Sequence, residues 1–212
     1  AIEIGAKNES KRLIPYLKKI RSEYPDILIS IDTFNSEVAH EALSNGANWI
    51  NDVTGGRRDE EILDVVSEFK CPFVITHSRG SSITMNNLTK YDDFLVDIIH
   101  SLESLTKKAL NKNVNKDKII WDPGIGFSKD TKQNIEILRN IHFFKNYGIP
   151  LLIGASRKRF IGEILNQPSP KERDIGTLAI SCLCSQQNIH LVRVHNVKIN
   201  HQVLKVADQI FR

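Results

Sequence analysis

The chain has 212 residues, a length at which single-domain α/β barrels are common. Its hydrophobic content of 41% and charged content of 25% are ordinary for a globular protein with a sizeable core. The formal net charge is +4, and the basic residues are scattered along the chain. There is no basic stripe interleaved with aromatic residues, which argues against a nucleic-acid partner and fits an anionic small molecule.

Cysteine usage and hydropathy bear on the compartment. Cys182 and Cys184 lie two positions apart in an apolar, helix-like run, where their side chains do not face each other, so no disulfide is expected between them. The sequence contains no C-x-x-C pair, the spacing typical of zinc sites. We therefore expect a reducing compartment, the cytoplasm or an organellar matrix in a eukaryote. No apolar run is long enough to span a membrane, and no signal peptide is visible.

Along the whole chain, short β-branched runs alternate with stretches that have the period of an amphipathic helix. The strand-like runs are almost continuously apolar, as strands buried on both faces of a parallel sheet require. The predicted strands span residues 2–5, 27–33, 48–53, 71–77, 118–122, 150–155 and 190–195. The predicted helices span Glu9–Glu23, Ser36–Asn45, Asp59–Phe69, Tyr91–Asn113, Thr131–Phe144, Arg173–Gln187 and Ile199–Phe211.

This βα repeat predicts an α/β fold with right-handed crossovers, either a closed barrel or an open doubly wound sheet. Seven βα units are present, whereas a closed (β/α)8 TIM barrel has eight. The chain starts inside a predicted strand without an initiator Met, so we expect the first strand of such a barrel to lie upstream. We predict a single barrel domain over residues 1–212 that is N-terminally incomplete, with an open seven-stranded sheet as the alternative.

Polar side chains stand where six of these strands end, and βα barrels build their active sites at strand ends. Loop polarity alone explains any one of them, but the set is chemically complementary. Carboxylate and amide groups suit a ring edge with adjacent hydrogen-bond donors and acceptors, as in a pterin. Positive charge and N–H donors suit a phosphate. The first kind comes from Asp32, Asn51 and Asp122, and the second from Lys158, Arg193 and His195.

Glycines at the same strand ends allow a ligand to approach the backbone closely, although tight turns alone also account for them. These glycines are Gly55, Gly56, Gly124, Gly126 and Gly154. No Walker A or Rossmann fingerprint is present, so a nucleotide site has little support.

Several longer segments carry a more specific signal. They read SIDTFNSEVAHEAL, INDVTGG, WDPGIGFSKDTKQN, GASRKRFIG, RDIGTLA and VRVHNV, and they span the chain from about Ile27 to its end. Each is weak alone, but DPGIGF-x-K followed by SRK and then RVH is a highly specific combination. In these segments and their order, the chain resembles the dihydropteroate synthase family of pterin-binding enzymes.

The resemblance implies roles for individual residues. The positions that would hold the pterin are Asp32, Asn51, Asp122 and Lys158. Those that would help to form the diphosphate pocket are Arg193 and His195, and those near the aminobenzoate site are Phe127 and Ser156. Gly154 is also predicted to bind substrate. We predict Asp32, Lys158 and Arg193 as the catalytic residues.

The resemblance also implies a reaction, in which 6-hydroxymethyl-7,8-dihydropterin diphosphate is joined to 4-aminobenzoate and diphosphate is released. Diphosphate would leave first, and the aromatic amine would attack the resulting cationic pterin-methylene. Positioning and electrostatics then carry the catalysis. Mg²⁺ is expected as the cofactor, sulfonamides as competitive inhibitors, and a homodimer formed through the late helices as the assembly.

Some features depart from the family pattern. Two glycine-rich loops that close over the site are not found, including a loop with the asparagine that helps to bind Mg²⁺, so no metal ligand is predicted in this chain. THSRG replaces an MHMxG pattern, and Asn196 stands where Asp is usual. Two alternatives therefore stay open. They are a non-catalytic pterin-binding paralogue and the pterin-binding domain of a corrinoid-dependent methyltransferase.

Overall fold

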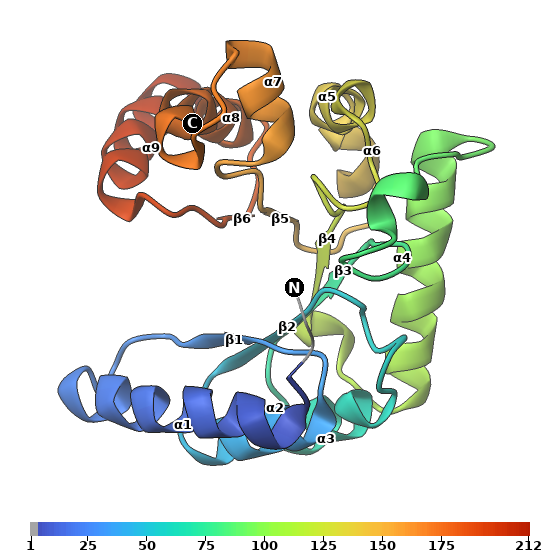
Figure 1. The fold of residues 1–212 in the computed structure, drawn as a ribbon, viewed down its shortest axis with the longest axis vertical. Helices are drawn as coiled ribbons and strands as arrows, with labels where there is room; N and C mark the ends of the chain where they lie inside the picture. Colours follow the sequence, from blue (N-terminus) through green and yellow to red (C-terminus); the bar gives the residue numbers. More distant parts are fainter. Residues whose placement is uncertain (1–3) are drawn as a thin grey trace. The chain divides into compact units, whose positions relative to one another are not determined.

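A computed structural model describes residues 4–212 and divides into two compact units (Figure 1). The first unit contains the chain up to His77 together with His100–Ile120, and the second contains Ser78–Ile99 and Trp121–Arg212. Parallel strands and helices alternate along both. Helix α4, Phe94–Asn111, and strand β4, Ile119–Asp122, lead from one unit into the other.

The first unit is built on three parallel strands. These are β1 (Ser30–Asp32), β2 (Trp49–Asp52) and β3 (Phe73–Thr76), neighbours in a sheet with the order β1-β2-β3-β4. The helices are α1 (Ala6–Glu23), α2 (Ser36–Ser44) and α3 (Glu61–Phe69), followed by the short 3-10 helix η2 (Lys116–Lys118). Helix α2 packs against both α1 and α3.

Helix α2 shows how the sequence sets this packing. Val38 and Ala42 have no exposed surface and Leu43 has 7%, which places one apolar face against the core. The helix ends before Gly46, whose φ of 93° is a conformation that L side chains rarely adopt. The predicted helix 36–45 is therefore confirmed to within one residue.

The second unit pairs β5 (Leu152–Ile153) with β6 (Leu191–Val192) in parallel, and Leu151 bridges in parallel to Trp121 of β4. Its longer helices are α5 (Thr131–Arg139), α8 (Asp174–Gln186) and α9 (Val197–Phe211). Its shorter ones are α6 (Ile141–Lys145), α7 (Arg159–Leu165) and the 3-10 helices η1 (Met85–Asn87) and η3 (Pro170–Arg173). Helix α8 packs against α9 and α7.

The sequence predictions hold for the order of the elements and need correction in detail. The predicted helix 131–144 is interrupted at Asn140, and helix α7 was not predicted. The predicted strand 2–5 falls mainly on residues 1–3, outside the described residues, while Ile4 and Gly5 belong to no strand. The other six strands are present but shorter than predicted.

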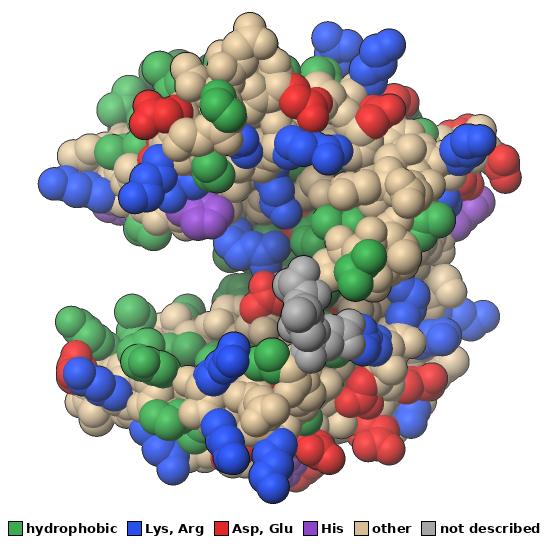
Figure 2. Space-filling model, viewed as in Figure 1, with side chains coloured by type: hydrophobic (Ala, Val, Ile, Leu, Met, Phe, Trp, Pro, Cys, Tyr) green, Lys and Arg blue, Asp and Glu red, His purple; other side chains and the backbone are tan. Residues whose placement is uncertain are grey.

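The surface agrees with the scattered charges of the sequence. On the face seen in Figure 2, Lys and Arg side chains are scattered among Asp, Glu and uncharged residues and form no continuous basic band. Within residues 4–212, no helix combines the length and the apolarity needed to cross a membrane.

Candidate active site

In the first unit, the strand pairing brings two of the predicted residues together. Residues 30–32 of β1 pair in parallel with residues 49–51 of β2, so that Asp32 is the register partner of Asn51. Partners in a parallel ladder lie side by side with their side chains on the same face of the sheet. Asp32 is exposed, whereas Asn51 is only 2% exposed. An acidic and an amide side chain thus lie next to each other at this strand end.

Asn51 is the most informative residue of this pair. Among the described residues, neither its Nδ2 nor its Oδ1 has a hydrogen-bond partner, although both atoms are buried. An unsatisfied buried amide costs about 1–3 kcal/mol per group. Each such group in a native structure calls for a physical explanation, and a ligand that supplies the missing partners is one. Asn51 therefore has the properties of a ligand-binding residue that presents one donor and one acceptor.

Asp52, the next residue, has a different role. Its Oδ1 accepts from the amide of Thr54 at 2.7 Å and its Oδ2 from the amide of Gly56 at 2.6 Å. Burial raises the pKa of this carboxyl, and these hydrogen bonds oppose the rise. Gly55 and Gly56 both have positive φ, of 60° and 77°. Asp52 therefore stabilises the turn after β2, and the two glycines adopt the positive φ angles of that turn.

In the second unit, Asp122 at the end of β4 is the central carboxylate, only 1% exposed. Its Oδ1 accepts from the amide of Gly124 at 2.8 Å, and its Oδ2 lies 3.4 Å from Nη2 of Arg193. Burial raises the pKa of Asp122, while the positive charges of Arg193, Lys158 and Lys129 oppose the rise. The structure therefore joins three of the predicted residues, Asp122, Lys158 and Arg193, in one electrostatic group.

Lys158 packs over the turn that follows β4. Its Nζ lies 4.2 Å from the centre of the Phe127 ring, a cation–π contact. A Cβ on Gly126 would come within 2.8 Å of Cδ of Lys158, and Gly126 has a φ of 80°. Glycine at position 126 therefore leaves the space in which the Lys158 side chain crosses the turn. Two predicted residues, Phe127 and Lys158, contact each other here.

Lys129 is the lysine of the segment DPGIGF-x-K, and the sequence alone assigns it no role. It is 4% exposed, and its Nζ donates to the carbonyl oxygens of Gly124 and Phe127 at 3.0 and 2.9 Å. A lysine in a polar loop is usually solvated, and only the fold reveals that this one is buried. By tying two carbonyl groups of the turn, Lys129 fixes the backbone that carries Phe127.

The remaining predicted residues lie at the ends of β5 and β6. A Cβ on Gly154 would lie 3.0 Å from Nη2 of Arg193, so glycine at this position lets the guanidinium group lie close to the backbone. The backbone amide of His195 donates to Oγ of Ser156 at 3.2 Å, and Nδ1 of His195 lies 3.0 Å from the same oxygen. Gly154, Ser156, Arg193 and His195 therefore form one neighbourhood.

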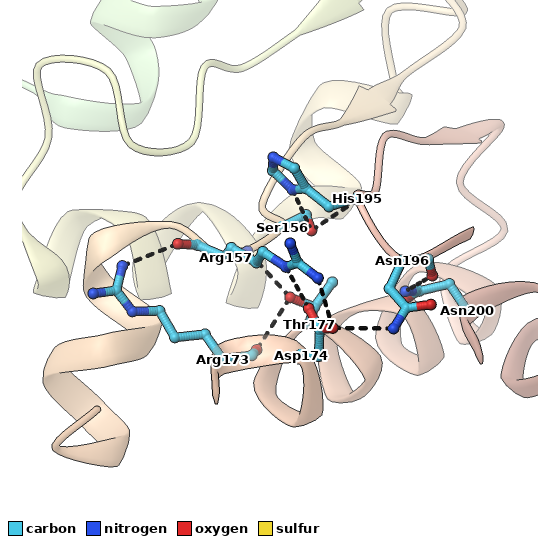
Figure 3. A network of polar contacts seen from close by, with 8 residues as sticks. All are labelled: Ser156, Arg157, Arg173, Asp174, Thr177, His195, Asn196 and Asn200. Atoms are coloured by element: carbon cyan, nitrogen blue, oxygen red, sulfur yellow. Dashed lines mark hydrogen bonds and ion pairs between the residues drawn. The ribbon is translucent and has the colours of Figure 1, made fainter. Parts of the chain in front are cut away.

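A network of polar contacts supports this neighbourhood from the side of α8 (Figure 3). Arg157 binds Asp174 through two hydrogen bonds, Nε to Oδ1 at 2.7 Å and Nη2 to Oδ2 at 2.9 Å. Arg157 has a φ of 58°, an unusual conformation for a residue other than glycine that costs about 1 kcal/mol or more. The pair of hydrogen bonds helps to hold the residue in that conformation.

Replacement of Asp174 by Asn is expected to remove a pH-dependent contribution to stability. The hydrogen bond from Arg157 lowers the pKa of Asp174 from 3.8 to about 2. A lowered pKa stabilises the fold above the unfolded-state pKa, and that contribution is lost as the pH falls through the folded-state pKa. Urea unfolding of wild type and Asp174→Asn at several pH values should show a difference that shrinks between about pH 4 and pH 2. A constant difference would contradict this assignment, and Asp26→Asn, at an exposed carboxylate, is the control.

The segment in which THSRG departs from the family pattern is also anchored to the turn after β4. Arg79 donates its backbone amide to Oγ of Ser128 at 2.9 Å, and the same hydroxyl donates to the carbonyl of Arg79 at 2.7 Å. The Arg79 guanidinium lies 3.7 Å from the centre of the Tyr91 ring, and the Tyr91 hydroxyl donates to the carbonyl of Ser128. Arg79 therefore has a structural role.

The described residues do not fit a resident metal ion. Within residues 4–212, no three His, Cys, Asp or Glu side chains gather as ligands. Asp32 pairs with an amide rather than with a second carboxylate, and the positive charge of Arg193 beside Asp122 disfavours a cation there. Hard cations such as Mg²⁺ prefer several oxygen ligands at one point.

Similarity to known proteins extends over almost the whole chain. The model of the pterin binding enzyme family matches residues 1–195. The dihydropteroate synthase of Synechocystis is 44% identical over 209 residues, covering 99% of this chain and 72% of that protein. The Pneumocystis carinii folic acid synthesis protein fol1 is 41% identical over 214 residues, but the chain spans only 29% of its length.

Solved structures agree in fold. Dihydropteroate synthase from Clostridium difficile, determined in the presence of pteroic acid, has a TM-score of 0.93 at 37% identity and covers 100% of this chain and 78% of its own. The Yersinia pestis enzyme, in a sulfonamide drug complex, has a TM-score of 0.93 at 27% identity and covers 98% and 75%. These matches confirm the predicted (β/α)8 barrel class. The chain belongs to the pterin-binding enzyme family and, within it, to the dihydropteroate synthases.

Proposed function

We propose that this chain condenses 6-hydroxymethyl-7,8-dihydropterin diphosphate with 4-aminobenzoate to give 7,8-dihydropteroate and diphosphate, a step of folate biosynthesis. The observation that carries the proposal is Asn51, a buried amide with no partner among the described residues, at the strand end where the family resemblance expects a pterin ligand. The ring edge of a pterin offers the acceptor and donor that this amide lacks. The alkyl or aryl transferase class follows from the same reaction.

On the pterin side, the acidic residues have distinct tasks. Asp122, buried and raised in pKa, would accept hydrogen bonds from the ring, and those bonds favour its charged form. Asp32, exposed beside Asn51, would stabilise the cationic pterin-methylene that remains when diphosphate leaves. Both tasks require a fixed carboxylate, and neither requires a nucleophile.

On the leaving-group side, the cationic residues of the second unit would stabilise the departing diphosphate. Arg193 is held by Asp122 and close to Gly154, and His195 is held by Ser156. Preorganised N–H donors cost no reorganisation as negative charge develops. Lys158, next to the Phe127 ring, places a further positive charge in this group. Phe127 and Ser156 are also the proposed neighbours of the aminobenzoate.

We propose Mg²⁺ as a cofactor that binds together with the diphosphate and is not a resident ion of the protein. The described residues supply no ligand cluster for it, so none of the steps above passes through the metal. The family resemblance supports a homodimer as the proposed assembly.

A reducing compartment, the cytoplasm or an organellar matrix, is proposed from the cysteines. Within the described part of the chain Cys71, Cys182 and Cys184 are free. Burial raises the pKa of Cys71 to about 11 and that of Cys184 to about 12. A thiolate is the reactive form, so these two should resist alkylation at pH 8 in the native protein. Mass spectrometry after brief iodoacetamide treatment should find the label on the half-buried Cys182, and fast labelling of Cys71 or Cys184 would contradict this.

Turnover with both substrates tests the proposed function directly. The purified protein should form dihydropteroate only when pterin diphosphate and 4-aminobenzoate are both present. A sulfonamide should raise the KM for 4-aminobenzoate without lowering kcat. Pterin binding without turnover would instead indicate the non-catalytic paralogue. Transfer of a methyl group in the presence of a corrinoid protein would indicate the methyltransferase alternative.

A further inference from the structure

Arg157 lies between Ser156 and Lys158 of the candidate site, but its own contacts are with the start of α8. Besides the two hydrogen bonds to Asp174, its backbone amide donates to Oγ1 of Thr177 at 3.2 Å. Its carbonyl oxygen accepts from Nη1 of Arg173 at 3.0 Å. Backbone and side chain together anchor the turn between β5 and α7.

Asn196 makes the matching contact from the segment that follows β6. It comes directly after His195, and its Nδ2 donates to Oδ2 of Asp174 at 3.1 Å (Figure 3). Its carbonyl oxygen accepts from Nδ2 of Asn200 at 2.8 Å, and Oδ1 of Asn200 accepts from the Ser181 hydroxyl at 2.6 Å. Asn200 and Ser181 are both buried, so this chain of hydrogen bonds fixes the position of Asn196, the residue that precedes α9.

We infer that the Asp174 carboxylate is a positioning group that fixes the two proposed anion-binding segments relative to each other. One segment is 156–158, held through Arg157, and the other is 193–196, held through Asn196. The direct contact of His195 with Ser156 joins the same two segments at their binding ends. The inference rests on the proposed function and assigns a role to residues that touch no substrate.

The arrangement requires an amide rather than a carboxylate at position 196. Asp at 196 would place a second acceptor where Nδ2 of Asn196 now donates, 3.1 Å from Oδ2 of Asp174. Like charges at that distance repel, and the carboxylate has no hydrogen to donate. Arg157 binds both oxygens of Asp174 and would be left to neutralise two acidic groups.

Two variants test the inference through ligand affinity. Calorimetry with inorganic diphosphate and, separately, with neutral 6-hydroxymethylpterin is applied to wild type, Asn196→Asp and Asp174→Asn. Asn196→Asp should weaken diphosphate binding about tenfold, as expected when a hydrogen bond to a charged group is lost. Pterin binding should stay within about twofold. Asp174→Asn removes one of the two acceptors of Arg157 and should also weaken diphosphate binding more than pterin binding.

The exposed Asn146→Asp supplies a control with the same chemical change and should bind both ligands as the wild type does. Unchanged diphosphate binding in Asn196→Asp or in Asp174→Asn, or an equal loss of affinity for both ligands, would each overturn the inference. Hydrogen exchange at the His195 amide needs no ligand and should be faster in Asn196→Asp than in wild type. Wild type that binds no pterin diphosphate would refute the proposed function, while the exchange result would still decide whether Asn196 positions His195.

Discussion

Replacement of Asp122 by Asn is expected to lower kcat/KM for the pterin diphosphate by about a thousandfold, equivalent to about 4 kcal/mol. The carboxylate is buried, accepts from Gly124 and contacts Arg193, so an amide of the same size leaves the guanidinium without its counter-charge. It also loses the charge that would accept hydrogen bonds from the ring. Steady-state kinetics with the pterin diphosphate varied at saturating 4-aminobenzoate measure the effect.

The pH dependence provides an internal check on this prediction. Burial raises the pKa of Asp122, so this carboxylate takes up a proton at a higher pH than an ordinary carboxylate does. As the pH is lowered, the wild type should therefore begin to lose pterin affinity at that higher pH. The difference in kcat/KM between the wild type and Asp122→Asn should therefore become smaller as the pH falls through that raised pKa. Asp117→Asn, an exposed carboxylate of η2, is the control and should behave as wild type. A deficit below about tenfold at neutral pH would show that Asp122 has only a structural role.

Replacement of Asn51 by Leu is expected to affect binding and stability in opposite directions. The buried amide of Asn51 has no hydrogen-bond partner among the described residues and destabilises the ligand-free protein. An apolar side chain of similar size should therefore raise the free energy of unfolding by about 1 kcal/mol. The same change removes the donor and acceptor for the ring and should weaken pterin binding at least about a hundredfold. Urea unfolding and pterin titration of one protein preparation measure both effects.

Thr76→Val is the matched control for Asn51→Leu. The Thr76 hydroxyl is also buried without a hydrogen-bond partner among the described residues, and valine has nearly the same shape. This change should also raise stability, by about 1 kcal/mol, but should leave pterin affinity unchanged. If Asn51→Leu bound pterin as tightly as Thr76→Val, Asn51 would not be a pterin ligand.

The sequence predicts the fold well because most of its elements have a clear period and clear ends. Helix α2 illustrates this, since its apolar face and the glycine after its end define it within one residue. Helix α7 was missed because seven residues are too few for a helical period to emerge from noise. The break at Asn140 was missed because the apolar pattern continues across it, with Ile137 and Ile141 both buried.

The candidate site shows the same division between what is local and what depends on the fold. Asp122, Lys158 and Arg193 stand at predicted strand ends, and the structure brings them into one group, as the sequence suggested. The supporting residues were not predicted, because an exposed and a buried lysine or aspartate look alike in a sequence. Lys129 stands in the segment DPGIGF-x-K and Asp174 in RDIGTLA, but their roles follow only from the contacts that the fold gives them.

The most direct test of the central claim is calorimetric titration of 6-hydroxymethyl-7,8-dihydropterin diphosphate into the wild type and the variants Asn51→Leu and Asp122→Asn. The residue assignments predict saturable binding of one ligand per chain in the wild type and a loss of at least about a hundredfold in each variant. Circular dichroism of the same samples should show that all three proteins are folded. Wild type without binding, or both folded variants with unchanged affinity, would contradict the assignment of these residues to a pterin site.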